Sequence, residues 1–292
     1  MESSFNGGRG KRVKSKTRNI MTLLKFIPKN HKYISDDETE WMSVTSLISN
    51  FKQPFDADKI AEKSSKSKKS KWYGLTPEEI KAAWKTEADR ATSLGTWYHN
   101  QRESDICGLE NMERQGCTVS VFKPIEVDGV KHSPNQKISE GVYPEHMVYL
   151  KSAGICGQSD LVEVINNKVH ITDYKTNKEI KVEGYTNWEG ITQKMSAPLS
   201  HLDDCHLNHY TLQLSMYMYI ILKHNPKLDF GSLTIHHILF EEAGKDRFGN
   251  PITAVDSNGN FIVKDVVVYD LPYLKKEAIS LIHWLEDKKN KK

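Results

Sequence analysis

Long apolar runs are absent from this chain of 292 residues. A membrane-spanning helix needs about 20 consecutive apolar residues, and the longest candidate, residues 216–222, is much shorter. The N-terminal stretch is basic and lacks the apolar segment of a secretory signal peptide. We therefore expect an intracellular protein, located in the cytoplasm, that has no membrane as a partner.

Cysteine is also scarce, and its spacing argues against several classes of site. The four cysteines are far apart and form no C-x-x-C pair, which argues against a zinc ribbon or a simple iron–sulfur cluster. A chain of this length can bury a core without disulfide bonds, so reduced thiols are expected. The cysteines are Cys107, Cys117, Cys156 and Cys205.

Net charge is small, at +3, but the positive residues are concentrated in two segments. Residues 9–32 contain nine lysines and arginines, and residues 63–71 have the sequence KSSKSKKSK, which includes Lys66, Lys68 and Lys69. Basic clusters of this kind bind a polyanion such as nucleic acid through the release of counterions. A solvated tail and a solvated loop are the alternative explanation, and composition leaves both open.

Two regions are expected along the chain: a flexible basic arm at residues 1–35 and a single folded domain at residues 36–292. The arm is rich in Gly, Ser, Lys and Arg, a composition typical of disorder. The Lys- and Ser-rich residues 63–71 are expected to form a loop. No internal repeat divides the remainder.

Capping residues predict where the helices begin. Thr76 is followed three residues later by Glu79, the arrangement of a capping box. Gly95-Thr96 is predicted to interrupt this helix. The helical stretch that follows carries His99 and Glu103 on one face, with Glu103 expected to be solvated. Further helices are expected at about 44–48, 207–223 and 272–287.

Apolar stretches bounded by turn residues predict strands between these helices. The pair Asn166-Asn167 is a turn signal, so the strands on either side of it are expected to form a hairpin. Strands are expected at 142–150, 155–165, 168–175, 233–241 and 260–269. Helices and strands in this order predict an α/β fold with a central mixed β-sheet flanked by helices.

A polar group lies at the end of the predicted hairpin. Residues two apart on a strand face the same side, so Asp173 and Lys175 project together while Tyr174 points away. Pairing residues 160–165 with 168–173 across the turn would bring Asp160 close to Asp173. Two neighbouring carboxylates are unfavourable unless a cation binds between them.

Hard oxygen ligands of this kind select Mg²⁺ or Mn²⁺. A bound metal activates a water and holds a phosphodiester, and Lys175 can orient that water or stabilise developing negative charge. The triplet Asp173-x-Lys175 alone is better explained by an ion pair on the surface of an edge strand. Other motifs along the chain favour the metal site.

Four short motifs occur in order: Gly95-Thr96-x-x-His99, Gly157-x-x-Asp160, Asp173-Tyr174-Lys175-Thr176 and Gln213-x-x-x-Tyr217. Together they resemble the RecB-like branch of the PD-(D/E)XK nuclease superfamily, to which phage exonucleases and the mitochondrial genome-maintenance exonuclease belong. The resemblance covers residues 95–217 and implies a restriction-endonuclease-like core with its catalytic part at about 95–225. A chain encoded by a phage would act in the host cytoplasm.

The resemblance implies a role for each matching residue. Asp160, Asp173 and Lys175 would be catalytic, and the metal ligands would be His99, Asp160, Asp173 and the backbone carbonyl of Tyr174. Gln213 and Tyr217 would support the lysine and contact DNA, and Tyr210 would extend their helical face or belong to the core. Glu145, on a strand where relatives often carry an acidic residue, is an accessory candidate. Lys66, Lys68 and Lys69 would contact DNA phosphates.

The implied function is a Mg²⁺- or Mn²⁺-dependent deoxyribonuclease, an exonuclease acting on free or single-stranded DNA ends in recombination, replication or DNA degradation. A structure-specific endonuclease or nickase, and a nucleic-acid-binding or structural protein that no longer cuts, are the alternatives. Some relatives hold an iron–sulfur cluster through cysteines near the C-terminus; no cysteine follows Cys205 here, so no cluster is expected. No P-loop motif occurs, so a helicase, or another recombination or replication protein, would be a separate partner.

Overall fold

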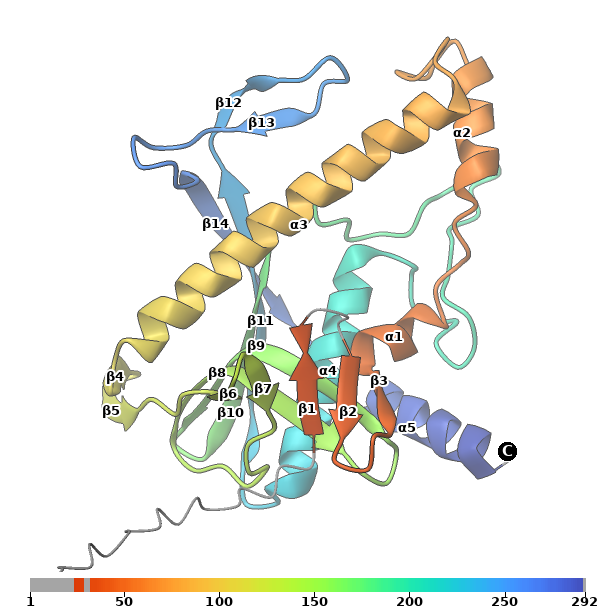
Figure 1. Cartoon of the computed structure of the whole chain (residues 1–292). Coiled ribbons are helices and arrows are strands. Elements are labelled where there is room, and N and C mark those ends of the chain that lie inside the picture. The colour runs from red at the N-terminus through yellow and green to blue at the C-terminus, as the bar shows by residue number, and fades with distance from the viewer. Residues whose placement is uncertain (1–23, 29–31, 291–292) are drawn as a thin grey trace, which may run out of the picture.

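The computed structural model describes residues 24–28 and 32–290, which form a large mixed β-sheet with helices packed against it (Figure 1). The strands of this sheet are β1 (Leu24–Ile27), β2 (Lys32–Ser35), β3 (Glu40–Ser43), β6 (Ile125–Val127), β7 (Val130–His132), β8 (Gly141–Leu150), β9 (Ile155–Ile165), β10 (Lys168–Lys175), β11 (Asp229–Phe240) and β14 (Val263–Leu271). The helices are α1 (Val44–Ser49), α2 (Ala57–Lys66), α3 (Pro77–Cys107), α4 (His206–His224) and α5 (Lys275–Asn290).

The strand order is β14-β11-β10-β9-β3-β2-β1-β7-β6, and β8 also pairs with β9. The pairs β10–β11 and β3–β9 are parallel, whereas β9 pairs with β8 and with β10 in the antiparallel sense. Two short hairpins lie outside the sheet, β4 (Asn111–Arg114) with β5 (Cys117–Ser120) and β12 (Glu242–Lys245) with β13 (Pro251–Thr253). The expected α/β class and mixed central sheet are confirmed.

The predicted hairpin of β9 and β10 is confirmed with its register. Lys168 pairs with Ile165, and the pairing continues to Thr172 and Leu161. Both turn residues, Asn166 and Asn167, have positive φ angles, 52° and 60°. A two-residue turn of this type suits the right-handed twist of paired strands, and asparagine adopts it at low cost.

Both faces of the sheet are covered, because successive side chains of a strand point to opposite faces and both sets are apolar in β9. Val162 and Val164 of β9 belong to the main core, together with buried residues of α1, α4 and α5. Leu161 and Ile165, on either side of this pair, face the opposite way, into a smaller core that includes Ile106 of α3. Helices therefore lie against both faces of β9, which buries the strand that carries Asp160.

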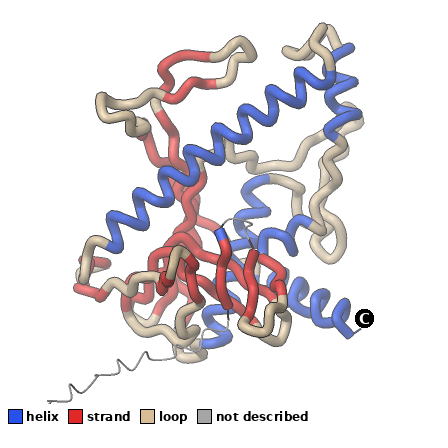
Figure 2. Tube along the Cα trace, in the orientation of Figure 1, coloured by secondary structure: helices blue, strands red, loops and turns tan. Residues whose placement is uncertain are grey.

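Helix α3 is a single helix of 31 residues that crosses the molecule diagonally, from α2 at one end to the β4–β5 hairpin at the other (Figures 1 and 2). Its capping box at Thr76 and Glu79 forms as predicted. The predicted interruption at Gly95-Thr96 is wrong, because the helix continues through both residues. Gly95 instead allows close packing: a Cβ added there would lie 3.2 Å from Thr176 Oγ1.

Two boundary predictions are also wrong. Leu24–Ile27 and Lys32–Ser35, expected in the flexible arm, are strands β1 and β2 of the sheet; residues 1–23 lie outside the described residues. The expected loop at residues 63–71 begins later than predicted, because α2 extends through Lys66, where an ion pair of 2.6 Å with Glu62 supports its last turn. Within the described ranges, no helix is long and apolar enough to cross a membrane.

Candidate metal centre

The candidate site lies between the part of β9 that pairs with β10 and the part that pairs with β3. On one edge, β9 pairs with β10 through residues 161–165 and with β3 through Ile155 and Cys156. Residues 157–160 lie between these two stretches and pair with neither strand, so the edge is open there. β8 pairs along the opposite edge of β9. Asp160 therefore stands at the margin of an opening within a continuous sheet.

Three carboxylates form a row across the strands at this opening. Extending the β9–β10 register by one residue places Asp173 beside Asp160. On the other side, Pro144 and His146 pair with Leu161 and Ser159, which places Glu145 opposite Asp160. Residues opposite one another in an antiparallel pair share a face of the sheet. Glu145 also has a φ of 50°, a costly conformation for a residue other than glycine and one that clusters at functional sites.

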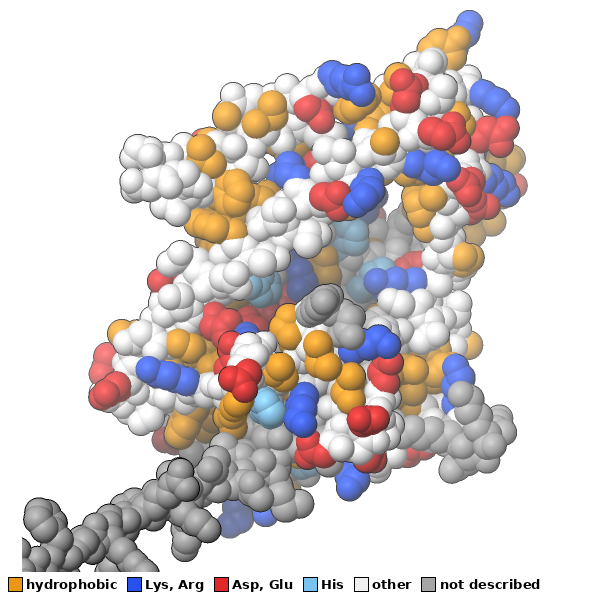
Figure 3. Space-filling view, in the orientation of Figure 1, with side chains coloured by type: hydrophobic (Ala, Val, Ile, Leu, Met, Phe, Trp, Pro, Cys, Tyr) orange, Lys and Arg blue, Asp and Glu red, His pale blue; other side chains and the backbone are white. Residues whose placement is uncertain are grey.

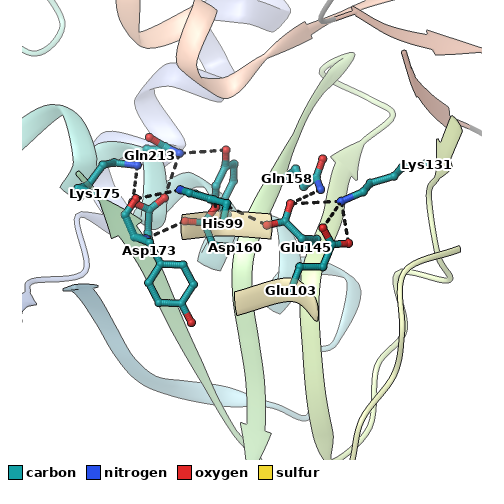
Figure 4. Close-up of polar contacts among 11 residues, drawn as sticks. His99, Glu103, Lys131, Glu145, Gln158, Asp160, Asp173, Lys175 and Gln213 are labelled. Carbon is teal, nitrogen blue, oxygen red and sulfur yellow. Dashed lines mark hydrogen bonds and ion pairs between the residues drawn. The ribbon is translucent and has the colours of Figure 1, made fainter. Parts of the chain in front are cut away.

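His99 of α3 lies next to this row of carboxylates (Figure 4). Its Nδ1 atom lies 3.5 Å from Asp160 Oδ1 and 3.8 Å from Glu145 Oε1. The ligand atoms of His99, Glu145 and Asp160 all lie within 4.8 Å of one another. One nitrogen and two carboxylate oxygens this close together can hold a divalent cation.

Tyr174 contributes its backbone to the site. Its N–H donates a hydrogen bond of 2.7 Å to Asp160 Oδ2, and its carbonyl oxygen lies 3.2 Å from His99 Nε2. The side chain of Tyr174 packs elsewhere, at 5.4 Å between ring centroids from Tyr98. The carbonyl predicted as a metal ligand thus lies beside the predicted ligand His99.

Asp173 and Lys175 form a buried ion pair at the inner end of the row. Asp173 is 1% exposed, and its Oδ2 atom contacts Lys175 Nζ. The lysine nitrogen also lies over the ring of Tyr210, 4.8 Å from its centroid. This cation–π contact and the ion pair hold the lysine in one place.

Gln213 and Tyr217, one turn apart on α4, support the same carboxylate. Gln213 Nε2 donates to Asp173 Oδ1 at 3.5 Å and to the Tyr217 hydroxyl at 3.3 Å. Tyr217 is only 3% exposed, so it supports the site from beneath; its contact with DNA stays a prediction. Tyr210 donates to Asn177 Oδ1 at 2.9 Å and is half-buried.

The pKa values of Asp160, His99 and Lys175 are all raised in the folded chain. Burial, together with the charge of Asp173, raises the pKa of Asp160 to about 7. Burial lowers the pKa of His99, but its hydrogen bond with Glu145 and the charge of Asp160 outweigh burial and raise it to about 9. For Lys175, burial also lowers the pKa, while the charges of Asp173 and Asp160 raise it to about 12. In the metal-free chain, bound protons compensate the carboxylates that a divalent cation would otherwise neutralise.

The residues predicted from the sequence fall into two groups. The described structure brings together His99, Glu145, Asp160, Asp173, Tyr174, Lys175, Tyr210, Gln213 and Tyr217. Lys66, Lys68 and Lys69 are exposed but remote. They lie in or just after α2, which packs on Ile80, and α3 runs about 29 Å from Ile80 to His99.

Three further residues, not assigned to the site from the sequence, extend it beyond Glu145. Lys131 Nζ lies 3.7 Å from Glu145 Oε2 and 2.8 Å from Glu103 Oε1, and Gln158 Nε2 donates to Glu145 (Figure 4). Glu103, expected to be solvated, is instead paired. In the sequence, only the position of Glu103 one helical turn after His99 pointed to the site, because its partner Lys131 comes from the distant strand β7.

The space-filling view shows that the surface is hollowed beneath α3 (Figure 3). Lysine or arginine and histidine side chains are visible at depth in this hollow, and acidic side chains lie on its lower side (Figure 3). The side chains of His99 and Glu145 are 29% and 14% exposed, so the candidate site is accessible from solvent.

Gly157 provides a test of how the site is packed. A Cβ at this position would lie 2.5 Å from Tyr217 Cε1, so Gly157→Ala is expected to destabilise the fold by about 1–3 kcal/mol through overpacking. Gly244→Ala is the matched control, because a Cβ there has nothing within 4 Å. Urea denaturation of both variants measures the difference, and equal stability would contradict the close contact of Tyr217 with β9.

Comparisons of the chain with protein-family models, with curated proteins and with solved structures find no match.

Proposed function

We propose that this chain is a divalent-metal-dependent DNA nuclease with the restriction-endonuclease-like core of the PD-(D/E)XK superfamily, of the RecB-like branch. One arrangement carries the proposal: Glu145, Asp160 and Asp173 lie in a row across three strands. His99 faces Asp160, and Lys175 pairs with Asp173. A surface Asp–Lys pair does not account for it, because Asp173 is buried and a histidine from another element faces Asp160.

The donor set fits Mg²⁺ or Mn²⁺. His99, Glu145 and Asp160 would hold the ion, with Asp173 and the Tyr174 carbonyl beside them. Oxygen ligands suit both ions, and an imidazole nitrogen favours Mn²⁺ over Mg²⁺. A bound ion of this kind polarises a phosphodiester and lowers the pKa of a water molecule.

Lys175 has a defined part in this chemistry. Because the charges of Asp173 and Asp160 raise its pKa to about 12 in the metal-free chain, Lys175 is protonated there at neutral pH and can act through its positive charge. Fixed by Asp173 and Tyr210, it can stabilise the negative charge that develops on a phosphate in the transition state. Gln213 keeps Asp173 in position for that task.

The function is tested by offering the purified protein end-labelled linear duplex, single-stranded and closed circular DNA with Mn²⁺, and with EDTA as the control. We expect loss of label from the linear and single-stranded molecules, with circles spared and with no reaction in EDTA. Nicked or linearised circles would favour the endonuclease alternative. DNA binding without cleavage in Mn²⁺ or Mg²⁺ would overturn the enzyme and leave the binding protein that no longer cuts.

Participation in recombination, replication or DNA degradation, an intracellular location and a separate helicase partner follow from this proposal and stay predictions. Phosphate contacts by Lys66, Lys68 and Lys69 would be made at the far end of α3, where α2 packs on Ile80, and α3 rises about 29 Å from Ile80 to His99. Such contacts would involve DNA well away from the bond that is cut.

A further inference from the structure

The two carboxylate oxygens of Glu145 have different surroundings. Oε1 lies 3.8 Å from His99 Nδ1, within the candidate metal site. Oε2 lies 3.7 Å from Lys131 Nζ and accepts a hydrogen bond from Gln158 Nε2 (Figure 4). One oxygen therefore belongs to the metal site, and the other is held by a cation and a hydrogen-bond donor of the protein.

Lys131 is held by a second carboxylate, that of Glu103, which lies one helical turn after His99 on α3. Its Nζ atom lies 2.8 and 2.9 Å from the two oxygens of Glu103. The side chains of Lys131, Glu103 and Glu145 are 18%, 23% and 14% exposed. Salt screens partly buried charges less than exposed ones, so the two glutamates fix the ammonium group between them.

A lysine also lies at the other end of the row of carboxylates, where Lys175 pairs with Asp173. Figure 4 shows the two lysines at opposite ends, with His99 and Asp160 between them. In this middle part, Glu145 Oε1 and Asp160 Oδ1 lie 3.8 and 3.5 Å from His99 Nδ1. These three atoms can share one cation.

We propose that the ammonium group of Lys131 takes the place of a second metal ion, so that the candidate site binds one divalent cation per chain. This inference rests on the proposed nuclease function. In two-metal sites the ions lie about 3.5–4 Å apart, a spacing that one carboxylate can bridge with its two oxygens. Glu145 is placed to bridge in this way, but its Oε2 atom and both oxygens of Glu103 contact Lys131. Lys131 is thus a positioning residue that keeps Glu145 Oε1 beside His99.

The experiment counts the Mn²⁺ ions bound per chain by equilibrium dialysis up to saturation, and records EPR spectra of the same samples. Lys131→Met keeps an unbranched apolar side chain and removes the charge, whereas Lys131→Arg keeps the charge. Adding Glu103→Gln to Lys131→Met removes a ligand of the second ion. Lys137→Met is the matched control, because Lys137 is an exposed lysine six residues further along the chain.

We expect the wild type to bind one Mn²⁺ per chain and to show the resolved hyperfine lines of an isolated ion. Lys131→Met should bind two ions, with a spectrum broadened by the coupling of neighbouring ions. Lys131→Arg, the double variant and Lys137→Met should each bind one ion. A structural role of Lys131 alone would change the stability of these variants without changing the count.

Two ions in the wild type, or a single ion in folded Lys131→Met, would overturn the role of Lys131 alone. The count in the wild type does not depend on any variant, so it tests the inference even if Lys131→Met does not fold. A wild type that binds no Mn²⁺ would overturn the metal centre as well. Mn²⁺ binding without cleavage of any DNA would overturn the proposed function, whatever the count.

Discussion

Replacing Lys175 with alanine is expected to lower the rate of Mn²⁺-dependent DNA cleavage by about 10²–10³-fold, the usual effect of removing one group that stabilises transition-state charge. The lysine side chain is 17% exposed and its amino group is held between Asp173 and Tyr210. Its loss should therefore fall on kcat, while DNA affinity measured in Ca²⁺ changes by less than about twofold.

Lys178→Ala is the control for this experiment. Lys178 follows β10 by three residues and is exposed, so the variant removes the same charge without touching the buried pair. It should cleave at the wild-type rate. Equal loss in both variants, or loss of DNA binding in step with cleavage in Lys175→Ala, would contradict a transition-state role. Thermal unfolding of the variants checks that removing the partner of buried Asp173 has not unfolded the protein.

Asp160→Asn is expected to make the metal-free protein more stable above pH 7. The pKa of Asp160 is raised to about 7 in the folded chain, from its ordinary value of 3.8. The folded state therefore binds this proton more tightly, and the stability it contributes is complete below about pH 4 and lost as pH rises through about 7. Asparagine keeps an acceptor for the Tyr174 N–H but never ionises.

The measurement is urea denaturation in EDTA between pH 5 and 8. The wild type should lose on the order of 2 kcal/mol relative to Asp160→Asn over this range. With Mn²⁺ the wild type should become the more stable of the two proteins. At a concentration about 100-fold above its Kd, the ion stabilises the wild type by about 2.7 kcal/mol, whereas the variant gains little. A variant that is stabilised by Mn²⁺ as much as the wild type would exclude Asp160 as a ligand.

The hairpin could be predicted because its information is local. Asn166 and Asn167 specify the turn, the alternation of β9 and β10 specifies the register, and these two facts bring Asp160 to Asp173. The helix start at Thr76 and the short helix from Val44 were predictable for the same reason, since caps depend on neighbours in sequence. Gly95 was misread because a glycine that breaks a helix and one that lets a strand approach look the same in sequence.

The parts that could not be predicted depend on contacts distant along the chain. β1 and β2 are short, mostly apolar strands in a segment with the composition of a flexible arm, and their strand pairing with β7 and β3 fixes them. Lys131, Glu103 and Gln158 join the site only because β7, α3 and β9 meet there. The four motifs identified the principal residues of the candidate site.

The two-residue turn at Asn166-Asn167 also sets an order of assembly. A hairpin closed by so short a loop forms within microseconds, before contacts that require long loops to close. We therefore expect Asp160 and Asp173 to meet early in folding, whereas His99 must arrive from a helix 75 residues before Tyr174. The folding chain would then hold Asp160 beside the Asp173–Lys175 pair but without its imidazole partner, so Mn²⁺ present during refolding should increase the folding rate.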